Sequence, residues 1–400
     1  MTIRARLRCR VAVAMIALAA GIAAGSAARA AEPAYGIDVV LPVTGTASFL
    51  GQAGQQALRL AETLVNRQGG IDGRPVRFRI HDDETSPQVA VQLASGLIAA
   101  HPPIILGSSV TAMCNAMAAL MRDGPVMYCY SPGIHPEAGS YIFSATAPTD
   151  GLLATMVRYF RRRGWTRLAL IVTTDATGQD GERAFDQALA APDLRDVTLV
   201  EHIRFTPSDV SIAAQVERIK AAQPQAVIAW TTGTPMGTVL KGFIQAGIAV
   251  PLGSSTGNMS YAFMRRYAAV LPKELYFSGN QGTARGEGLR LDPRVVAAKR
   301  TYYDLFREAG LVPDTGDEVT WDATMIAVAA LRHTGPDPTA GKIRDYIAHL
   351  QGFPGISGVY DFVKYPQRGL GADSPVVVRW DPAHTLFRAV SQPGGAPIAR

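Results

Sequence analysis

Apolar residues along this chain fall into short continuous runs that alternate with longer segments of helical periodicity. The run at 37–41 predicts a buried strand, and the segment from about Gln52 to Gly69 predicts a helix with one apolar face. That face consists of Ala57, Ala61, Leu64 and Val65. Further short apolar runs follow at 76–80, 104–106, 126–128, 168–172, 227–230 and 251–253, with helical segments between them. Strands that alternate with helices in this way predict parallel sheets covered by helices on both faces.

The alternation occurs twice, with a break near residues 145–150. Two runs predict two similar α/β lobes, and the chain of 400 residues is well above the ~100–200 residues of a typical domain. The last third differs in its order of elements. It has predicted helices at 292–309, 317–332 and 340–350, followed by predicted strands near 358–363 and 376–380. Such a tail suits a chain that returns to complete both lobes.

The first thirty residues have the order of a secretory signal peptide. A start with four arginines precedes an apolar segment at 11–24, and small residues follow at Ala28 and Ala30. The apolar segment is shorter than the ~20 residues of a spanning helix, so cleavage near Ala30 is favoured over a membrane anchor. We therefore expect an exported, periplasmic protein. Because Cys9 lies before the expected cleavage site, a lipid-anchored mature terminus is not expected.

Export changes the charge of the chain. Loss of residues 1–30 removes five arginines and no acidic residue, which takes the formal net charge from +6 to +1. No basic stripe remains, so neither nucleic acid nor anionic lipid is an expected partner. The motifs C-x-x-C, H-E-x-x-H, G-x-x-x-x-G-K-[ST] and a strand-linked G-x-G-x-x-G are absent, so we expect no metal and no cofactor. A monomer is expected.

Two cysteines remain after the signal segment, Cys114 and Cys129. The first falls early on a predicted helix and the second late on the next predicted strand, so both are expected at the same end of a parallel sheet. An oxidising compartment permits a disulfide between them, whereas two buried thiols are the alternative. The sequence leaves both open.

Several short blocks give the chain a family resemblance. The most specific block is 66–75, an N-x-x-G-G-I-x-G turn after the first helix. Supporting blocks follow in the family's order at 41–45, 82–87, 106–109, 130–133 and 321–323. On these blocks the chain resembles, over nearly its whole mature length, the periplasmic binding proteins of the branched-chain amino acid (leucine/isoleucine/valine-binding) type, the receptors of ABC importers.

The resemblance implies a type I periplasmic binding protein fold, with two Rossmann-like lobes, parallel central sheets and three hinge crossovers. The crossovers would lie near 146–149, 277–280 and 356–359. Lobe 1 would comprise 31–147 and 279–357, and lobe 2 would comprise 148–278 and 358–400. The resemblance also implies a small organic ligand, an amino acid or an aromatic or aliphatic acid, which hinge closure captures for an ABC permease complex in the membrane.

Ligands of open α/β sheets bind at the carboxyl ends of strands. The loop 107–111 follows a strand and opens a helix, so its backbone N–H groups and the hydroxyls of Ser108, Ser109 and Thr111 suit a carboxylate. The alternative is that one hydroxyl only caps the helix. By the resemblance, Thr111 holds the ligand's carboxylate, and Gly133 and His135 add further groups. His135 stands where the family usually has threonine, and it could equally be an ordinary loop residue.

The expected second lobe departs further from the family. The turn 175–178 lacks the tyrosine of the family's D-x-Y-G, which leaves Asp175 and Thr177 as candidates, and Thr234 stands where relatives often carry tyrosine. The acidic residue that binds the ligand's α-ammonium should lie near 254–256, but this segment, which includes the candidates Ser255 and Thr256, is neutral. Burial of an unpaired ammonium is costly.

Two explanations for the neutral segment remain. Either Asp175 or Asp150 replaces the missing acid, or the ligand carries no ammonium group, and we favour the second. A carboxylate with an apolar or aromatic body would then fit. Phe49 and Tyr130 are candidate packing surfaces for that body, and core packing is the alternative for each ring.

An enzyme is the main rival. The segment 253–257 matches G-x-S-x-G, the nucleophile elbow of α/β-hydrolases, and would make Ser255 the nucleophile of a serine hydrolase. None of the downstream histidines His333, His349 and His384 is marked as its base, so we expect no enzyme. A ligand sensor for a membrane receptor would have the same fold and is a second alternative.

Overall fold

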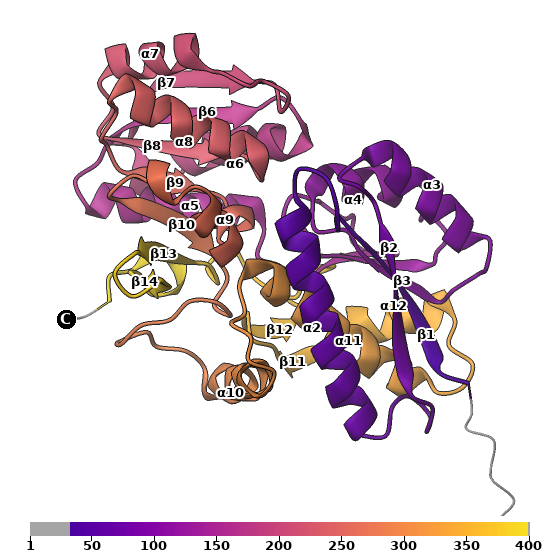
Figure 1. The fold of residues 1–400 in the computed structure, drawn as a ribbon. Coiled ribbons are helices and arrows are strands. Elements are labelled where there is room, and N and C mark those ends of the chain that lie inside the picture. Colours follow the sequence, from indigo (N-terminus) through magenta and orange to yellow (C-terminus); the bar gives the residue numbers. More distant parts are fainter. Residues whose placement is uncertain (1–32, 399–400) are drawn as a thin grey trace, which may run out of the picture. The chain divides into compact units, whose positions relative to one another are not determined.

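The computed structural model describes residues 33–398. The predicted signal peptide, its cleavage near Ala30 and Cys9 lie outside these residues. Two sheets organise the described chain, as the sequence predicts, and each is built from strands that alternate with helices (Figure 1). Within residues 33–398, no helix has both the length and the apolar character needed to cross a membrane.

The first sheet has five parallel strands in the order β2-β1-β3-β4-β5. Its strands are β1 (Tyr35–Leu41), β2 (Val76–Asp82), β3 (Ile104–Gly107), β4 (Val126–Cys129) and β5 (Ile142–Ser144). Its helices are α2 (Ser48–Arg67), α3 (Pro87–Ile98) and α4 (Thr111–Ala118). Successive residues of β1 face opposite sides, since Val39 packs toward α2 whereas Val40 packs toward α3 and α4. This sheet is therefore buried on both faces, which explains its apolar strands.

The second sheet has seven strands in the order β14-β13-β10-β9-β8-β6-β7. The strands are β6 (Arg167–Thr173), β7 (Thr198–Phe205), β8 (Ala226–Trp230), β9 (Leu252–Ser254), β10 (Leu275–Gly279), β13 (Val376–Asp381) and β14 (Leu386–Ala389). β6 to β10 are parallel, but β13 and β14 are antiparallel to their neighbours. The predicted parallel central sheet is thus present, and the C-terminal hairpin adds two antiparallel strands at one edge without a helical crossover.

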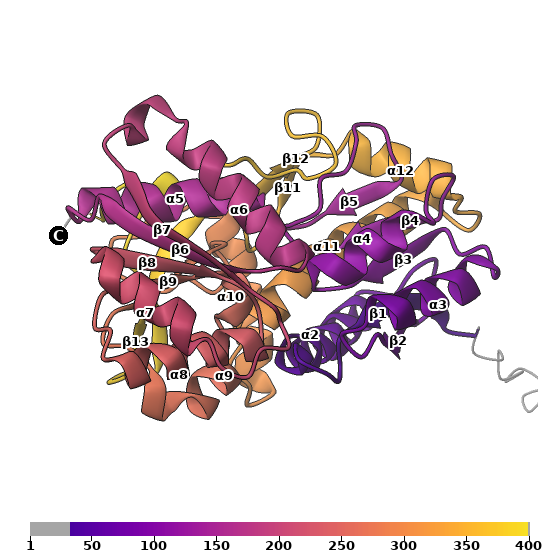
Figure 2. The same ribbon diagram turned by 90° about the horizontal axis from the view of Figure 1, so that it is seen from above.

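Helices cover both faces of the second sheet (Figure 2). α5 (Thr149–Arg162) and α6 (Ala176–Leu189) pack on one face, while α7 (Ala213–Ala222), α8 (Thr234–Ala246) and α9 (Tyr261–Arg266) pack on the other. Short 3₁₀ turns lie at Pro192–Leu194, Thr256–Asn258, Ala268–Val270 and Pro393–Gly395.

The chain then returns to the first sheet. α10 (Pro293–Glu308), α11 (Thr315–Thr334) and α12 (Ala340–Ala348) contribute Tyr302, Ile326 and Ile343 to the core that contains β1 and α2. α11 lies beside α2 (Figure 1). We call the first sheet with its helices the first lobe, and the second sheet with its helices the second lobe.

The return to the second lobe comes later than predicted. β11 (Gln351–Pro354) and β12 (Val359–Asp361) form a small antiparallel pair, and Tyr360, Phe362 and Leu370 are buried in the first lobe's core. The Tyr360 hydroxyl donates to the Ala145 carbonyl at 2.6 Å, which ties this segment to the first lobe. The predicted boundary at residue 358 is therefore too early, and the chain enters the second sheet only at β13.

Candidate functional site

A cavity of about 40 Å³ lies where the carboxyl ends of strands from both lobes meet. Segments 109–111 and 130–132, which follow β3 and β4, line it with Leu50, Thr315 and Val319 of the first lobe. The second lobe adds Thr149, Thr177, Asp180, Trp230, Thr232 and segment 255–257. Its walls are rich in hydroxyl groups, and Asp180 is the only charged residue among those that line it within the described chain.

The three predicted hydroxyls of the loop before α4 lie in two different environments. Ser108 is fully buried and its Oγ donates to Asp83 Oδ2 at 2.5 Å, so it faces the protein interior and not the cavity. Ser109 and Thr111 do line the cavity. The Ser109 Oγ is buried and has no hydrogen-bond partner among the described residues, whereas Thr111 Oγ1 lies 2.8 Å from Ser131 Oγ. Two of the three predicted positions thus lie in the cavity wall, and Ser108 does not.

The start of α4 shows whether one of these hydroxyls caps the helix. The residue before its first turn is Val110, and no side chain caps the helix. None of the three hydroxyls thus serves as an N-cap acceptor, and backbone N–H groups of the first turn remain available at the cavity.

A disulfide joins Cys114 of α4 to Cys129 at the end of β4, with a Cα–Cα distance of 6.1 Å. Both residues are fully buried. The bond ties together the two elements that carry the cavity segments 109–111 and 130–132. Of the two alternatives that the sequence left open, the structure has the disulfide.

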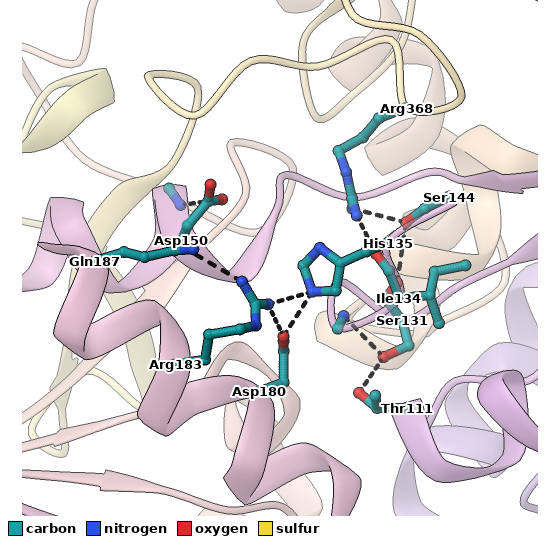
Figure 3. A network of polar contacts seen from close by, with 12 residues as sticks. Thr111, Ser131, Ile134, His135, Ser144, Asp150, Asp180, Arg183, Gln187 and Arg368 are labelled. Atoms are coloured by element: carbon teal, nitrogen blue, oxygen red, sulfur yellow. Dashed lines mark hydrogen bonds and ion pairs between the residues drawn. The ribbon is translucent and has the colours of Figure 1, made fainter. Parts of the chain in front are cut away.

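His135 bridges the lobes at the edge of the site. Its Nε2 lies 2.6 Å from Asp180 Oδ1, and Arg183 of α6 contacts both groups (Figure 3). The His135 side chain is about half exposed and is absent from the cavity wall. Burial would raise the pKa of Asp180, but the hydrogen bonds from His135 and Thr149 and the Arg183 cation outweigh it and lower that pKa. Asp180 is therefore a carboxylate at neutral pH.

Gly133 lies behind the cavity wall, between the two lobes. A methyl group at this position would collide with the Thr111 hydroxyl and would lie 2.9 Å from Asp180 Oδ2. The absence of a side chain is thus what allows Thr111 and Asp180 to approach the same small volume.

The second-lobe predictions have mixed outcomes. Asp175 caps α6, since its Oδ1 accepts from the Gly178 N–H at 3.0 Å and from the Thr173 hydroxyl at 2.7 Å, and it is not in the cavity wall. Thr177, two residues later, does line the cavity, and its hydroxyl is buried without a partner among the described residues. Thr234 begins α8, is exposed and is not in the cavity wall. Thr177 is the one of these three that reaches the cavity.

Ser255 and Thr256 line the cavity. The Ser255 hydroxyl donates to the Thr231 carbonyl at 2.8 Å and lies 3.3 Å from the Asn258 amide nitrogen. Its backbone is ordinary extended chain, with φ −66°, and not the strained turn of a nucleophile elbow. These contacts give the serine hydrolase hypothesis no support.

The two predicted aromatic packing surfaces differ in their position relative to the cavity. Tyr130 lines the cavity, and burial raises the pKa of its hydroxyl well above the usual value. Phe49 does not line it, because its ring packs on Phe263 of α9 at a centroid distance of 5.8 Å. Phe49 is thus a contact between the lobes in this structure.

Other contacts hold the lobes together around the cavity. Thr256 Oγ1 lies 3.2 Å from Thr315 Oγ1, and the Tyr261 N–H donates to Asp314 Oδ2 at 3.2 Å. At the first crossover, the buried Arg368 donates to Ser144 Oγ and to the Thr146 carbonyl, both at 3.0 Å (Figure 3). The two lobes are therefore in contact around the cavity.

Two buried carboxylates of α11 hold the second crossover and the turn between β11 and β12. Glu318 accepts from the Gly282 N–H at 2.5 Å and from the Thr283 hydroxyl at 2.7 Å, just after β10. Asp322, one turn later, accepts from the Ile356 and Ser357 N–H groups at 2.8 and 2.9 Å. Burial raises the pKa of Glu318 to about 7. α11 thus holds both the segment that enters the first lobe after β10 and the turn that precedes β12.

Comparison with known proteins gives matches over most of the chain. The family model described as periplasmic binding protein matches residues 36–383. The Leu/Ile/Val-binding protein homolog 3 of Brucella melitensis is 24% identical over 215 residues, which are 53% of this chain and 57% of that protein. The match thus spans little more than half the length of that relative.

Solved structures agree on the fold. An extracellular ligand-binding receptor from Rhodopseudomonas palustris HaA2 superposes with a TM-score of 0.78 at 20% identity, over 90% of this chain and 100% of the other. An ABC transporter solute-binding protein from R. palustris in complex with benzoate superposes with a TM-score of 0.73 at 20% identity, over 92% and 97% of the two chains. These likenesses confirm the predicted two-lobed α/β architecture.

Proposed function

The chain belongs to the periplasmic binding protein family, and from this premise we propose that it is an extracytoplasmic receptor for a small carboxylate-bearing solute. The receptor would deliver this solute, an amino acid or an aromatic or aliphatic acid, to an ABC permease complex in the membrane. Export through a signal peptide cleaved near Ala30 would place it in the periplasm. Among the relatives, one is named for leucine, isoleucine and valine, and one structure holds benzoate, so both ligand classes occur among similar proteins.

The observation that carries the proposal is the composition of the cavity wall. It combines unpartnered hydroxyls from opposite lobes, Ser109 and Thr177, with the uncapped start of α4. A buried hydroxyl without a partner is costly, so these groups indicate a ligand that supplies acceptors. The free N–H groups and positive end of α4 favour an anion there, and a carboxylate is the smallest organic group that meets both demands.

Closure follows from the position of the cavity between the lobes. Residues of both lobes line it and contact each other around it, so entry requires the lobes to separate at the three crossovers. A ligand that contacts both lobes stabilises the closed state by its differential affinity. We propose that the crossovers lie near 145–149, 279–283 and 371–375.

A thermal-shift screen of the mature protein tests the proposal. The panel should contain amino acids, aromatic acids, aliphatic acids and small amides, because a bound ligand adds RT ln(1 + [L]/Kd) to stability. We expect carboxylates and not the matching amides to raise the melting temperature. Small-angle scattering with and without the best ligand should then show compaction. Stabilisation by amides alone would contradict the proposal, and so would a radius of gyration that stays unchanged with every stabilising ligand.

A further inference from the structure

Asp180 is the one charged side chain in a cavity otherwise lined by hydroxyls, backbone and apolar groups of the described residues. The residue is only 8% exposed. Its Oδ1 is occupied by His135 at 2.6 Å and by Arg183, whereas its Oδ2 is buried and has no partner of full hydrogen-bond geometry among the described residues. Thr149 lies near enough to contribute to the lowering of the pKa of Asp180.

A buried carboxylate oxygen without a donor is costly, and an ionised carboxylate can accept about four hydrogen bonds. The contacts with His135 and Arg183 lie at Oδ1, so they do not relieve Oδ2. Asp180 is one of the residues that line the cavity, which makes a ligand there the natural source of a donor.

The second observation is the proximity of this oxygen to the anion subsite. A methyl group on Gly133 would contact both the Thr111 hydroxyl and Asp180 Oδ2, so the two oxygens face one small volume. A ligand carboxylate bound at Thr111 would therefore approach the Asp180 carboxylate, and like charges at this range repel each other. A positive nitrogen on the ligand, adjacent to its carboxylate, would remove the repulsion and supply the donor.

We propose that Asp180 determines specificity for a ligand in which a protonated amine stands next to the carboxylate. This inference rests on the function proposed above and narrows its ligand class. It replaces the favoured expectation of a ligand without an ammonium group, and it assigns the role neither to Asp175 nor to Asp150. The segment 254–256, where the resemblance places the acid, remains neutral, and α6 supplies the charge instead.

Matched ligand pairs test this assignment. Isothermal titration should compare L-leucine with 4-methylpentanoate and L-phenylalanine with 3-phenylpropanoate, since each pair differs only in the α-amino group. We expect the wild type to prefer the amino member of the pair that binds better by about tenfold or more, about 1.4 kcal/mol. The variant Asp180→Asn should lose that preference, because it keeps the shape but removes the charge.

A control separates charge recognition from lobe closure, since Asp180→Asn also weakens the contact with His135 and Arg183. The double variant His135→Gln, Arg183→Met breaks that contact and retains Asp180. It should weaken both members of a pair by the same factor and leave their ratio unchanged. Circular dichroism and melting temperature should confirm that each variant folds.

The outcomes distinguish the two proposals. If the wild type prefers the des-amino acid or binds both members equally, the role of Asp180 is overturned while the proposal of a carboxylate receptor stands. This ratio of the two wild-type affinities is decisive even if Asp180→Asn fails to fold. An amino preference that survives in Asp180→Asn would also overturn it. No binding by any carboxylate in the wider panel would overturn the proposed function itself.

Discussion

The disulfide between Cys114 and Cys129 supports the binding loops, and its loss should have a measurable cost. The bond closes a loop with a sequence separation of 15 residues. For a loop of about this length, the reduced entropy of the unfolded chain contributes roughly 3 kcal/mol to stability. Because both sulfurs are fully buried, the native protein should resist mild reductant, and the effect should emerge when the chain unfolds.

Equilibrium urea unfolding with and without dithiothreitol measures this contribution. We expect the reduced wild type to be less stable than the oxidised protein by about 3 kcal/mol at an unchanged fold. The double variant Cys114→Ala, Cys129→Ala is the matched control, because it has no thiol in the mature chain and its unfolding should not depend on reductant. It should also have a lower stability than the oxidised wild type.

Two results would refute this reasoning. If the wild type unfolds at the same urea concentration in both conditions, the bond is absent or contributes nothing. If the double variant shows the same sensitivity to reductant as the wild type, the effect does not arise from this pair.

Three further predictions follow from the site and the hinge. Thr111→Ala should weaken binding of the best carboxylate ligand by about 1–3 kcal/mol in titration calorimetry. Thr111→Ser should retain most of the affinity, because the hydroxyl and not the methyl group contacts the anion. Equal affinities of wild type and Thr111→Ala would remove Thr111 from the site. Gly133→Ala should lower affinity by at least about tenfold and cost about 1–3 kcal/mol in urea unfolding, because its methyl group would crowd the Thr111 hydroxyl and Asp180 Oδ2. Unimpaired binding would show that the ligand lies elsewhere. Glu318→Gln should change the pH dependence of stability. The pKa of Glu318 in the folded protein is about 7, above the usual 4.5, so between these pH values the folded wild type retains a proton that the unfolded chain has released. The stability of the wild type therefore falls by up to about 3 kcal/mol as the pH rises from about 4.5 to 7. The Gln variant should lack that loss in urea melts at pH 5 and pH 8, and parallel profiles for both proteins would contradict it.

The order of elements could be predicted because it depends on local patterns. Each strand of the first sheet is buried on both faces and therefore reads as an apolar run, and α2 shows its buried face in the spacing of Ala57 and Ala61. The return of the chain could not be predicted to the residue. Tyr360 and Phe362 have the apolar character of either core, and only their packing beside β5 and α11 shows to which lobe they belong.

In the loop before α4, the sequence does not show which hydroxyl side chains face the cavity. Ser108, Ser109 and Thr111 all carry hydroxyl groups and follow the same strand, so the sequence does not separate them. In the structure Ser109 lines the cavity and Ser108 does not. Ser108 turns inward to Asp83, whose own position depends on β2 and on the loop after it. Which of two adjacent serines reaches the ligand is therefore decided by a partner elsewhere in the chain.

Asp180 was missed for a different reason, and the reason suggests how such residues can be found. The family pattern points to an acid in a strand-end loop, where Asp175 is the obvious candidate, but a residue at the cap uses its carboxylate on the helix it begins. Beyond the cap, residues three apart share a helical face, and Thr177 and Asp180 both line the cavity. The first two turns of a helix that starts at a ligand-facing sheet edge therefore extend the site along that helix. A polar pair at this spacing, Thr177 with Asp180, is the sequence signal that would have indicated the charge.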